Sequence, residues 1–230
     1  MRRSVLFLAA LAAAPGFAQD ASLLAAAQKE GAFTLYTSFA EKDLPPLTGA
    51  FEKTGKLPAE KPVVASKAAD IFTDEGNAAE LRKAGANGEL GSWLKAHLSR
   101  VHGGDYVALL AYIERDGKHI EALQKMRMAV RDEKHLATCA EFGPRFLHST
   151  GQAYKGGSDK GVFLQITADD ARDLAVPGQA YTFGVVKAAQ ARGDFDVLAE
   201  RGRRLLRVHL PADLAAGLTV LGRALEQALR

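Results

Sequence analysis

The amino-acid sequence predicts an α/β fold, a three-layer sandwich in which a mainly parallel sheet has helices on both faces. The first observation is a series of short, nearly continuous apolar runs, which are typical of strands buried on both faces. They lie at 105–113, 136–142, 162–167 and 205–210. The second observation is that helical segments separate these runs or follow the last one, at 118–131, 181–200 and 213–230. Such alternation is typical of parallel sheets, in which ligands bind outside the carboxyl ends of the strands.

The remaining elements are shorter or less regular. Amphipathic helices are predicted at 77–84 and 90–101, ahead of the first apolar run. After the second run, Pro144 is predicted to open a short helix through Gln152, which the sequence Lys155-Gly156-Gly157 ends. The helix at 181–200 has a possible break at Gly193-Asp194. Nearer the N-terminus we expect a helix at 21–30, a strand at 32–38, a helix at 41–53 and an irregular connection at 56–67.

Composition argues against several functional classes. Apolar residues make up 47% and charged residues 25% of the 230 residues, as in ordinary globular proteins. The 30 basic and 27 acidic side chains are too evenly mixed for a nucleic-acid-binding surface. The single cysteine, Cys139, rules out an internal disulfide and a cysteine-built metal site, and its strand context favours a small buried core residue. We expect neither a metal nor a cofactor. The densest basic cluster is predicted to be a solvent-exposed helix C-terminus and contains Arg201, Arg203, Arg204 and Arg207.

The first residues are typical of a secretory signal peptide. Arg2-Arg3 is positively charged, residues 5–14 are apolar, and the small residues at 16–18 suit cleavage after Ala18. The alternative is the disordered or helical N-terminus of a cytosolic protein. The apolar stretch is too short to cross a bilayer as a stable helix, and no other stretch approaches that length, so no membrane span is expected.

Candidate chemistry is concentrated at 142–157, directly after a predicted strand. Arg145, His148, Ser149 and Gln152 are expected near the carboxyl end of that strand, beside a helix N-terminus. That N-terminus and the Gly156-Gly157 backbone would suit an anion. His148 would act as a general acid or base near neutral pH. The alternative is a histidine at a helix start with one satisfied hydrogen bond.

Parts of this segment resemble a known family. The sequences LHSTGQ at 147–152 and KGG at 155–157 resemble a segment of glucose-6-phosphate isomerase in the form fused to transaldolase. The likeness continues in order at 104–114, 161–170 and 181–191. It covers roughly 71–210. The resemblance implies that 61–230 is the C-terminal sugar-isomerase half of this family, a Rossmann-like domain of the SIS type that binds carbohydrate derivatives.

The resemblance also implies an activity, the isomerisation of glucose 6-phosphate and fructose 6-phosphate in glycolysis and gluconeogenesis. His148 resembles the histidine that opens the sugar ring. Lys187 resembles the family's C-terminal lysine, although the spacing around it differs, and a solvated helix lysine is the alternative. Glu52, in EKTGK at 52–56, is the candidate base that moves a proton between C1 and C2, although the second residue of the motif differs. Substrate contacts are expected from Arg145, Ser149, Gln152, Lys155, Gly156 and Gly157.

The N-terminal part resembles a different family. Residues 23–31, 35–39 and 50–55 resemble the start of periplasmic solute-binding proteins of ABC transporters. The two resemblances meet near 52–56, and both include Glu52, so we interpret the chain as a fusion. The expected organisation is a signal peptide at 1–18, a solute-binding-protein-like fragment and linker at 19–60, and an isomerase-like domain at 61–230.

The fusion affects the expected function. The family's first sugar-isomerase subdomain, which supplies its phosphate cradle, has no counterpart in this sequence, and neither does the transaldolase barrel. We therefore expect a sugar-phosphate site with impaired turnover, which a homo-oligomer or a complementing isomerase chain would complete. The alternatives are an exported solute receptor and a non-functional remnant. The signal peptide predicts export to the periplasm, whereas the isomerase family works in the cytoplasm.

Overall fold

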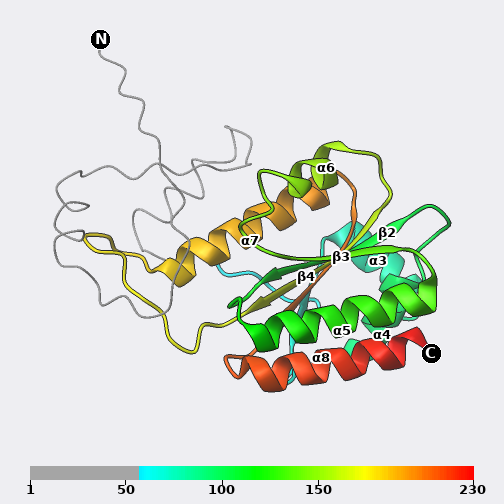
Figure 1. The fold of residues 1–230 in the computed structure, drawn as a ribbon, viewed down its shortest axis with the longest axis horizontal. Coiled ribbons are helices and arrows are strands. Elements are labelled where there is room, and N and C mark those ends of the chain that lie inside the picture. The colour runs from blue at the N-terminus through cyan, green and yellow to red at the C-terminus, as the bar shows by residue number, and fades with distance from the viewer. Residues whose placement is uncertain (1–56) are drawn as a thin grey trace, which may run out of the picture. The chain divides into compact units, whose positions relative to one another are not determined.

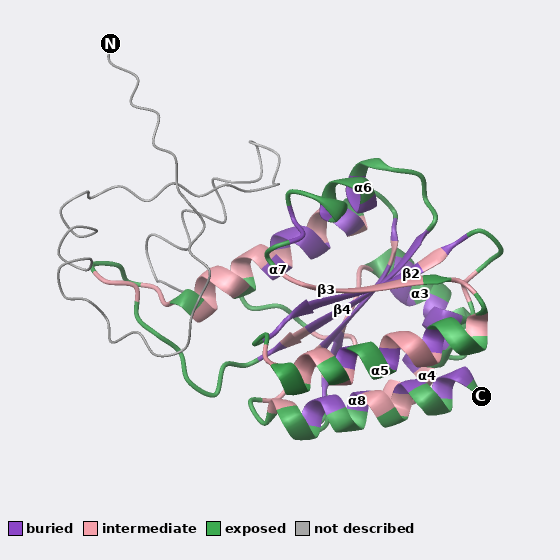
Figure 2. Ribbon diagram, in the orientation of Figure 1, coloured by how far each residue is buried: buried purple, intermediate pink, exposed green. Residues whose placement is uncertain are grey.

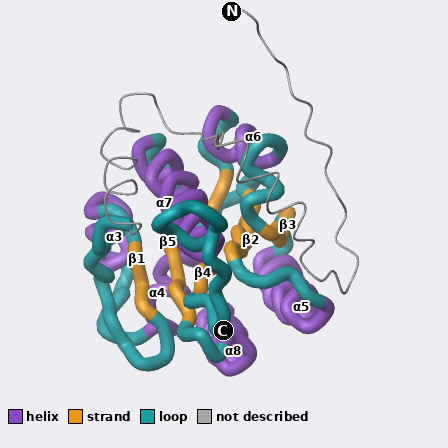
Figure 3. Tube along the Cα trace, turned by 90° about the vertical axis from the view of Figure 1, so that its left-hand side faces the viewer, coloured by secondary structure: helices purple, strands orange, loops and turns teal. Residues whose placement is uncertain are grey.

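The computed structural model describes residues 57–230, in which a five-stranded sheet lies between two layers of helices (Figure 1). The strands are β1 (Asp70–Phe72), β2 (Tyr106–Tyr112), β3 (Ala137–Phe142), β4 (Gly161–Ala168) and β5 (Arg204–Leu210). Their order is β1-β5-β4-β2-β3, from left to right in Figure 3. Strands β2 to β5 are parallel, and β1 pairs antiparallel with β5. The predicted fold class is confirmed.

Helices cover both faces of the sheet. They are α3 (Glu75–Lys83), α4 (Leu90–Leu98), α5 (Gly117–Lys134), α6 (Thr150–Gly156), α7 (Phe183–Glu200) and α8 (Leu214–Leu229). Helices α4, α5 and α8 lie against one face, and α6 and α7 lie against the other (Figure 3). The short helix α3 packs beside α4 and β5.

Each central strand contributes to two cores, because successive side chains point to opposite faces. On β5, Leu206, Val208 and Leu210 belong to the core under α4, α5 and α8, whereas Leu205 belongs to the core under α6 and α7. The strands are therefore buried along most of their length (Figure 2). This two-sided burial explains why their sequences are almost continuously apolar.

Helix starts are fixed by side chains that accept the free backbone N–H groups of the first turn. Asp116 accepts a hydrogen bond from the backbone of His119 at the start of α5, at 2.7 Å. Thr182 accepts one from Val185 at the start of α7, at 3.2 Å. These caps determine where the chain turns from each strand end into the next helix.

The chain reverses its direction of winding between β2 and β4. From β2 it passes through α5 to β3 on one side, and then returns through α6 to β4 on the other side of β2. Neighbouring carboxyl ends at such a switch point leave a crevice, which is the usual ligand site of open parallel sheets.

Two details of secondary structure differ from the sequence predictions. The short helix begins at Thr150, not at Pro144, because residues 143–149 form turns. The Gly193-Asp194 sequence does not break α7, which continues to Glu200 while both residues are buried. Packing therefore overrides the weak helix propensity of glycine at this position.

Burial of two groups also differs from prediction. Arg201 is exposed at the C-cap of α7, but Arg203 and Arg207 are 7% and 4% exposed, so only part of the basic cluster is a solvated helix end. Arg207 belongs to β5, where apolar neighbours alternate with it. Cys139 lies on β3 at the edge of the sheet and is only half-buried, which corrects the expectation of a buried strand there.

Several predictions lie outside the described residues. They are the signal peptide at 1–18, the helices at 21–30 and 41–53, the strand at 32–38, and the candidate base Glu52. Between residues 57 and 230, none of the helices combines the length and the apolar character needed to cross a bilayer.

Candidate functional site

The α7-facing side of the sheet changes from apolar to polar toward the carboxyl ends of β4 and β5. Phe163 and Leu205, near the starts of these strands, belong to the core under α6 and α7. The residues that follow them on the same face are polar, and they pair across the two strands. They are Gln165 opposite Arg207, and Thr167 opposite His209.

A cavity of 220 Å³ lies at this polar end, against α7. It includes Tyr112, the last residue of β2, so it lies at the switch point between β2 and β4, and we call it the switch-point cavity. Its lining combines cations, a carboxylate and an imidazole with apolar groups. The lining residues are Leu57, Glu60, Phe72, Tyr112, Thr167, Ala168, Lys187, Ala188, Ala191, Arg207 and His209.

Arg207 forms the buried cationic side of the cavity. Its guanidinium carbon lies 4.2 Å from the ring centre of Phe72 and 4.8 Å from that of Phe195. Nη2 pairs with Oε2 of Glu60 at 2.8 Å, while the buried Nε has no hydrogen-bond partner among residues 57–230. The aromatic rings and this carboxylate thus hold a largely buried cation.

His209 is the imidazole of the cavity. Its Nδ1 lies 2.9 Å from the hydroxyl of Thr167, and its Nε2 lies 3.2 Å from a carboxylate oxygen of Asp169. The side chain is 31% exposed, so it touches both the cavity and solvent. These two partners orient the ring and occupy both of its nitrogens, so proton exchange with a ligand requires that one partner, such as the exposed Asp169, be displaced.

Lys187, the lysine expected from the family resemblance, also lines the cavity. It extends from the second turn of α7 and pairs with Asp170 in the loop after β4. Asp173 in the same loop accepts a hydrogen bond from the backbone of Gly184 at 2.8 Å. A hydrogen bond from the Thr182 hydroxyl is the main cause that lowers the pKa of Asp173. Two carboxylates therefore lie at the start of α7, close to Lys187.

The predicted site residues at 145–152 lie apart from this cavity. His148 is exposed and does not line this cavity. Arg145 is likewise exposed. Ser149 Oγ donates to the carbonyl of Phe146 at 3.3 Å, and Gln152 Nε2 donates to the carbonyl of Leu147 at 2.7 Å, so both side chains stabilise their own turn.

The three predicted anion-binding residues at the end of α6 differ from one another. Lys155 is buried, and its Nζ lies 2.6 Å from Oδ1 of Asp194. The backbone N–H of Gly157 donates to the carbonyl of Ala153 at 2.8 Å. Gly156 is exposed. In this structure, the Lys155 ammonium and the Gly157 amide are thus engaged within the protein.

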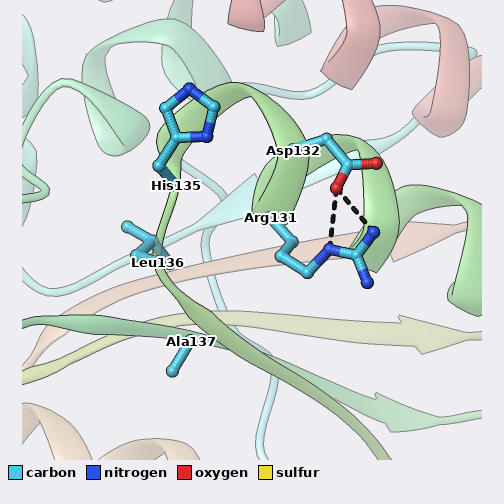
Figure 4. A pocket seen from close by; sticks show the side chains of 5 residues that line it. All are labelled: Arg131, Asp132, His135, Leu136 and Ala137. Atoms are coloured by element: carbon cyan, nitrogen blue, oxygen red, sulfur yellow. Dashed lines mark hydrogen bonds and ion pairs between the residues drawn. The ribbon is translucent and has the colours of Figure 1, made fainter.

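A larger hollow of 540 Å³ lies at the other end of the sheet, where α5 meets the start of β3. Figure 4 shows the side chains that line it, among them Arg131 paired with its neighbour Asp132. This ion pair is 2.6 Å long. His135, Leu136 and Ala137 complete it. Because the hollow lies at the amino end of β3, away from the switch point, it is the weaker candidate despite its size.

Within the described residues, one group has spacing suited to a metal ion. Atoms of Glu114, Asp116 and His119 lie within 4.8 Å of one another after the end of β2. The protein itself uses these groups, because Asp116 caps α5 and the His119 ring bonds to the carbonyl of Glu114 at 3.0 Å. A helix cap accounts for the cluster.

Sequence reasoning selected Lys187 but missed Glu60, Arg207 and His209. A signal for two of them was present, because Arg207 and His209 are charged or titratable residues two apart in an apolar strand. That spacing places both on one face of the sheet at its carboxyl end. Glu60 belongs to an irregular segment, for which no periodicity exists.

Comparisons with known proteins support the fold but identify no chemistry for the cavity. No protein-family model matches the chain, and no curated protein matches it. Among solved structures, the chain is similar to the crystal structure of hypothetical protein TT0462 from Thermus thermophilus, with a TM-score of 0.54 and 15% sequence identity. The match covers 67% of this chain and 43% of that one, so this chain corresponds to less than half of its neighbour. At this identity the likeness supports the α/β sandwich alone.

Proposed function

We propose that 61–230 is a sugar-phosphate domain of the glucose-6-phosphate isomerase type, and that its ligand occupies the switch-point cavity. One observation carries this proposal. Lys187, which the family resemblance selects, lines the cavity together with Arg207 and His209. Cations beside an imidazole at the carboxyl ends of parallel strands suit a phosphorylated, ring-opening substrate.

Each lining group has a role in this proposal. Lys187 and Arg207 attract the phosphate, and Arg207 adds a planar fork that matches oxyanions. His209, which Thr167 orients through Nδ1, exchanges a proton with a sugar oxygen during ring opening once the substrate displaces Asp169 from Nε2. Isomerisation then needs a carboxylate that moves a proton between C1 and C2, and Glu52 remains the candidate from the sequence.

The location of His148 favours binding over turnover. Its exposed imidazole lies outside the cavity, and an acid–base group must come within hydrogen-bond reach of the reacting proton. In the proposed mode of action, a partner chain or a second copy brings the missing groups to the cavity. The chain alone binds sugar phosphate and turns it over slowly.

A coupled assay of fructose 6-phosphate conversion, with a thermal-shift titration of glucose 6-phosphate, tests the proposal. Lys187→Ala is expected to abolish conversion and the thermal shift. The matched control is Lys83→Ala, because Lys83 is an exposed helix lysine that is also paired with an acid. If the wild-type chain shows neither conversion nor any thermal shift with substrate or a six-carbon phosphorylated acid, the proposal is wrong.

A further inference from the structure

The starting observation is a buried arginine with one carboxylate partner. Arg207 is 4% exposed, and Glu60 is the acid that pairs with its guanidinium, at 2.8 Å. Removing a guanidinium from water is costly unless an anion compensates its charge. Some anion must therefore occupy the position that the carboxylate of Glu60 occupies here.

Glu60 belongs to an irregular segment that side-chain contacts hold against the sheet and α7. Residues 57–62 have no regular secondary structure, and none of them makes a backbone–backbone hydrogen bond to residues 57–230. Within residues 57–230, the polar side-chain contacts to this segment come from Arg207 of β5 and Arg192 of α7. Arg192 donates to the carbonyl of Pro58 at 2.7 Å and lies 3.8 Å from the Glu60 carboxylate.

The cavity beside this pair has further basic groups that would attract an anion larger than a carboxylate. Lys187 and His209 line the same 220 Å³ space as Arg207 and Glu60. Lys187 is paired with Asp170, on the side of the cavity formed by α7 and the loop after β4. An oxyanion that replaced the Glu60 carboxylate would therefore bind the Arg207 guanidinium in a cavity that Lys187, a second cation, also lines.

From this geometry we propose that Arg207 is a phosphate-binding subsite, which Glu60 closes by placing its carboxylate where a phosphate group binds. The ligand class is a phosphate monoester, which pairs with the guanidinium fork as a carboxylate does and carries more negative charge. Glu60 leaves when the phosphate enters, and the segment 57–62 moves with it. The inference rests on the proposed function for the sugar attached to the phosphate, but phosphate binding is measurable without turnover.

The direct test is calorimetric titration of inorganic phosphate into the full chain and into its Glu60→Gln variant. A closed subsite lowers the apparent affinity by the fraction of molecules that are open. We expect Glu60→Gln to bind phosphate about tenfold more tightly than the wild type. Equal affinities, or no binding by either protein, would overturn the inference.

Asp196→Asn provides the matched charge control. Asp196 lies 3.8 Å from Arg192, so this variant gains the same unit of net charge in the same cluster and leaves the Glu60–Arg207 pair intact. Its phosphate affinity is expected to stay within about twofold of the wild type. An increase equal to that of Glu60→Gln would show a general charge effect and refute the subsite.

Two double variants identify the subsite. Arg207→Met in the Glu60→Gln background is expected to lose phosphate binding. If the melting curve shows that this double variant is unfolded, Lys187→Ala in the Glu60→Gln background replaces it as the test. We expect its phosphate affinity to fall about fivefold or more. Unchanged binding in the folded variants would place the phosphate elsewhere. Titrations with glucose 6-phosphate and unphosphorylated glucose separate a phosphate requirement from a sugar requirement.

This test and the isomerase assay can fail independently. Binding of inorganic phosphate that depends on Glu60 and Arg207, with neither conversion of fructose 6-phosphate nor a thermal shift with glucose 6-phosphate, would support the subsite and reject the isomerase. Conversion that Glu60→Gln leaves unchanged, with unchanged phosphate affinity, would support the isomerase and reject the subsite.

Discussion

Lys155 Nζ lies 2.6 Å from Asp194 Oδ1, and these side chains are only 6% and 1% exposed. The pair joins α6 to α7 inside the core that also contains Tyr112. Burial raises the pKa of Asp194, and the nearby Lys155 ammonium opposes that effect. Burial likewise raises the pKa of Tyr112 far above its ordinary value, with the Asp194 charge as a second cause. The expected ligand-binding lysine thus contributes to the packing of two helices.

Replacing one member of this pair is predicted to destabilise the protein more than replacing both. Asp194→Asn leaves a buried ammonium without a counter-ion, so we expect a loss of about 3–5 kcal/mol in the free energy of unfolding. The double replacement Lys155→Met with Asp194→Leu removes both charges and is expected to lose far less. Urea denaturation at neutral pH measures both. A single-variant loss below about 1 kcal/mol would contradict a dry ion pair.

The pH dependence of stability is predicted to follow His97, which is 1% exposed. Burial, followed by the charge of Arg100, lowers the pKa of His97 to about 3. The unfolded chain therefore binds a proton below pH 6.5 that the folded chain refuses, and the His97 contribution is complete above that value and declines as pH falls toward 3. Between about pH 7 and 5 the loss is about 2 kcal/mol.

Replacing His97 by glutamine isolates this effect. Nε2 of His97 lies 3.0 Å from the carbonyl of Phe163, and a glutamine amide retains a donor for that hydrogen bond. Denaturation of both proteins at about pH 7, 6 and 5 gives the difference in slope. Parallel stability curves would show that His97 is not the group that titrates.

The architecture could be predicted from sequence because hydrophobic periodicity is a local signal. The run at 162–167, for example, corresponds to β4, which extends only one residue further at each end. Asp70–Phe72 was not predicted, because three residues contain no measurable period and β1 depends on pairing with β5. The prediction that a helix begins at Pro144 was also wrong, because the propensity of one residue does not decide whether the following turns become helical.

The site was predictable only in part. Lys187 was selected from family resemblance; it lines the switch-point cavity, and its role there stays a prediction. Glu60 and Arg207 meet across more than a hundred residues of sequence, so no spacing rule could pair them. The sequence around Lys155 and Asp194 does not indicate that they are buried. Which face of a helix is buried depends on the elements that pack against it, and these are not known from the local sequence.

The adjacent glycines at the end of α6 are predicted to respond differently to alanine. A Cβ at Gly157 would collide with the carbonyl oxygen of Ala153, whereas a Cβ at Gly156 meets nothing within 4 Å. We expect Gly157→Ala to lower the free energy of unfolding by about 1–3 kcal/mol, because backbone must move. Gly156→Ala is the matched control and is expected to be neutral or slightly stabilising. Thermal denaturation compares them, and equal effects would contradict the close packing at Gly157.

The last prediction concerns the two acids at the start of α7. A Cβ at Gly184 would lie 2.5 Å from Oδ2 of Asp170 and 2.6 Å from Oδ2 of Asp173, so both carboxylates lie against the same glycine. Asp170 pairs with Lys187, whereas Asp173 bonds to the backbone of Gly184 and to Thr182. Under the proposed function, Asp170→Asn frees Lys187 for the phosphate, and we expect glucose 6-phosphate to bind about fivefold more tightly, or roughly 1 kcal/mol.

Asp173→Asn distinguishes the release of Lys187 from simple loss of negative charge. This variant removes the same charge from the same place but keeps the Lys187–Asp170 pair, so its affinity for glucose 6-phosphate is expected to change little. It is expected to lose about 1 kcal/mol of stability instead, because a neutral amide accepts more weakly from the first turn of α7. Calorimetric titration of both variants measures the affinity for glucose 6-phosphate, and thermal denaturation measures the change in stability. Equal gains in affinity would mean that repulsion by the acids, and not the pairing of Lys187, limits binding at this site.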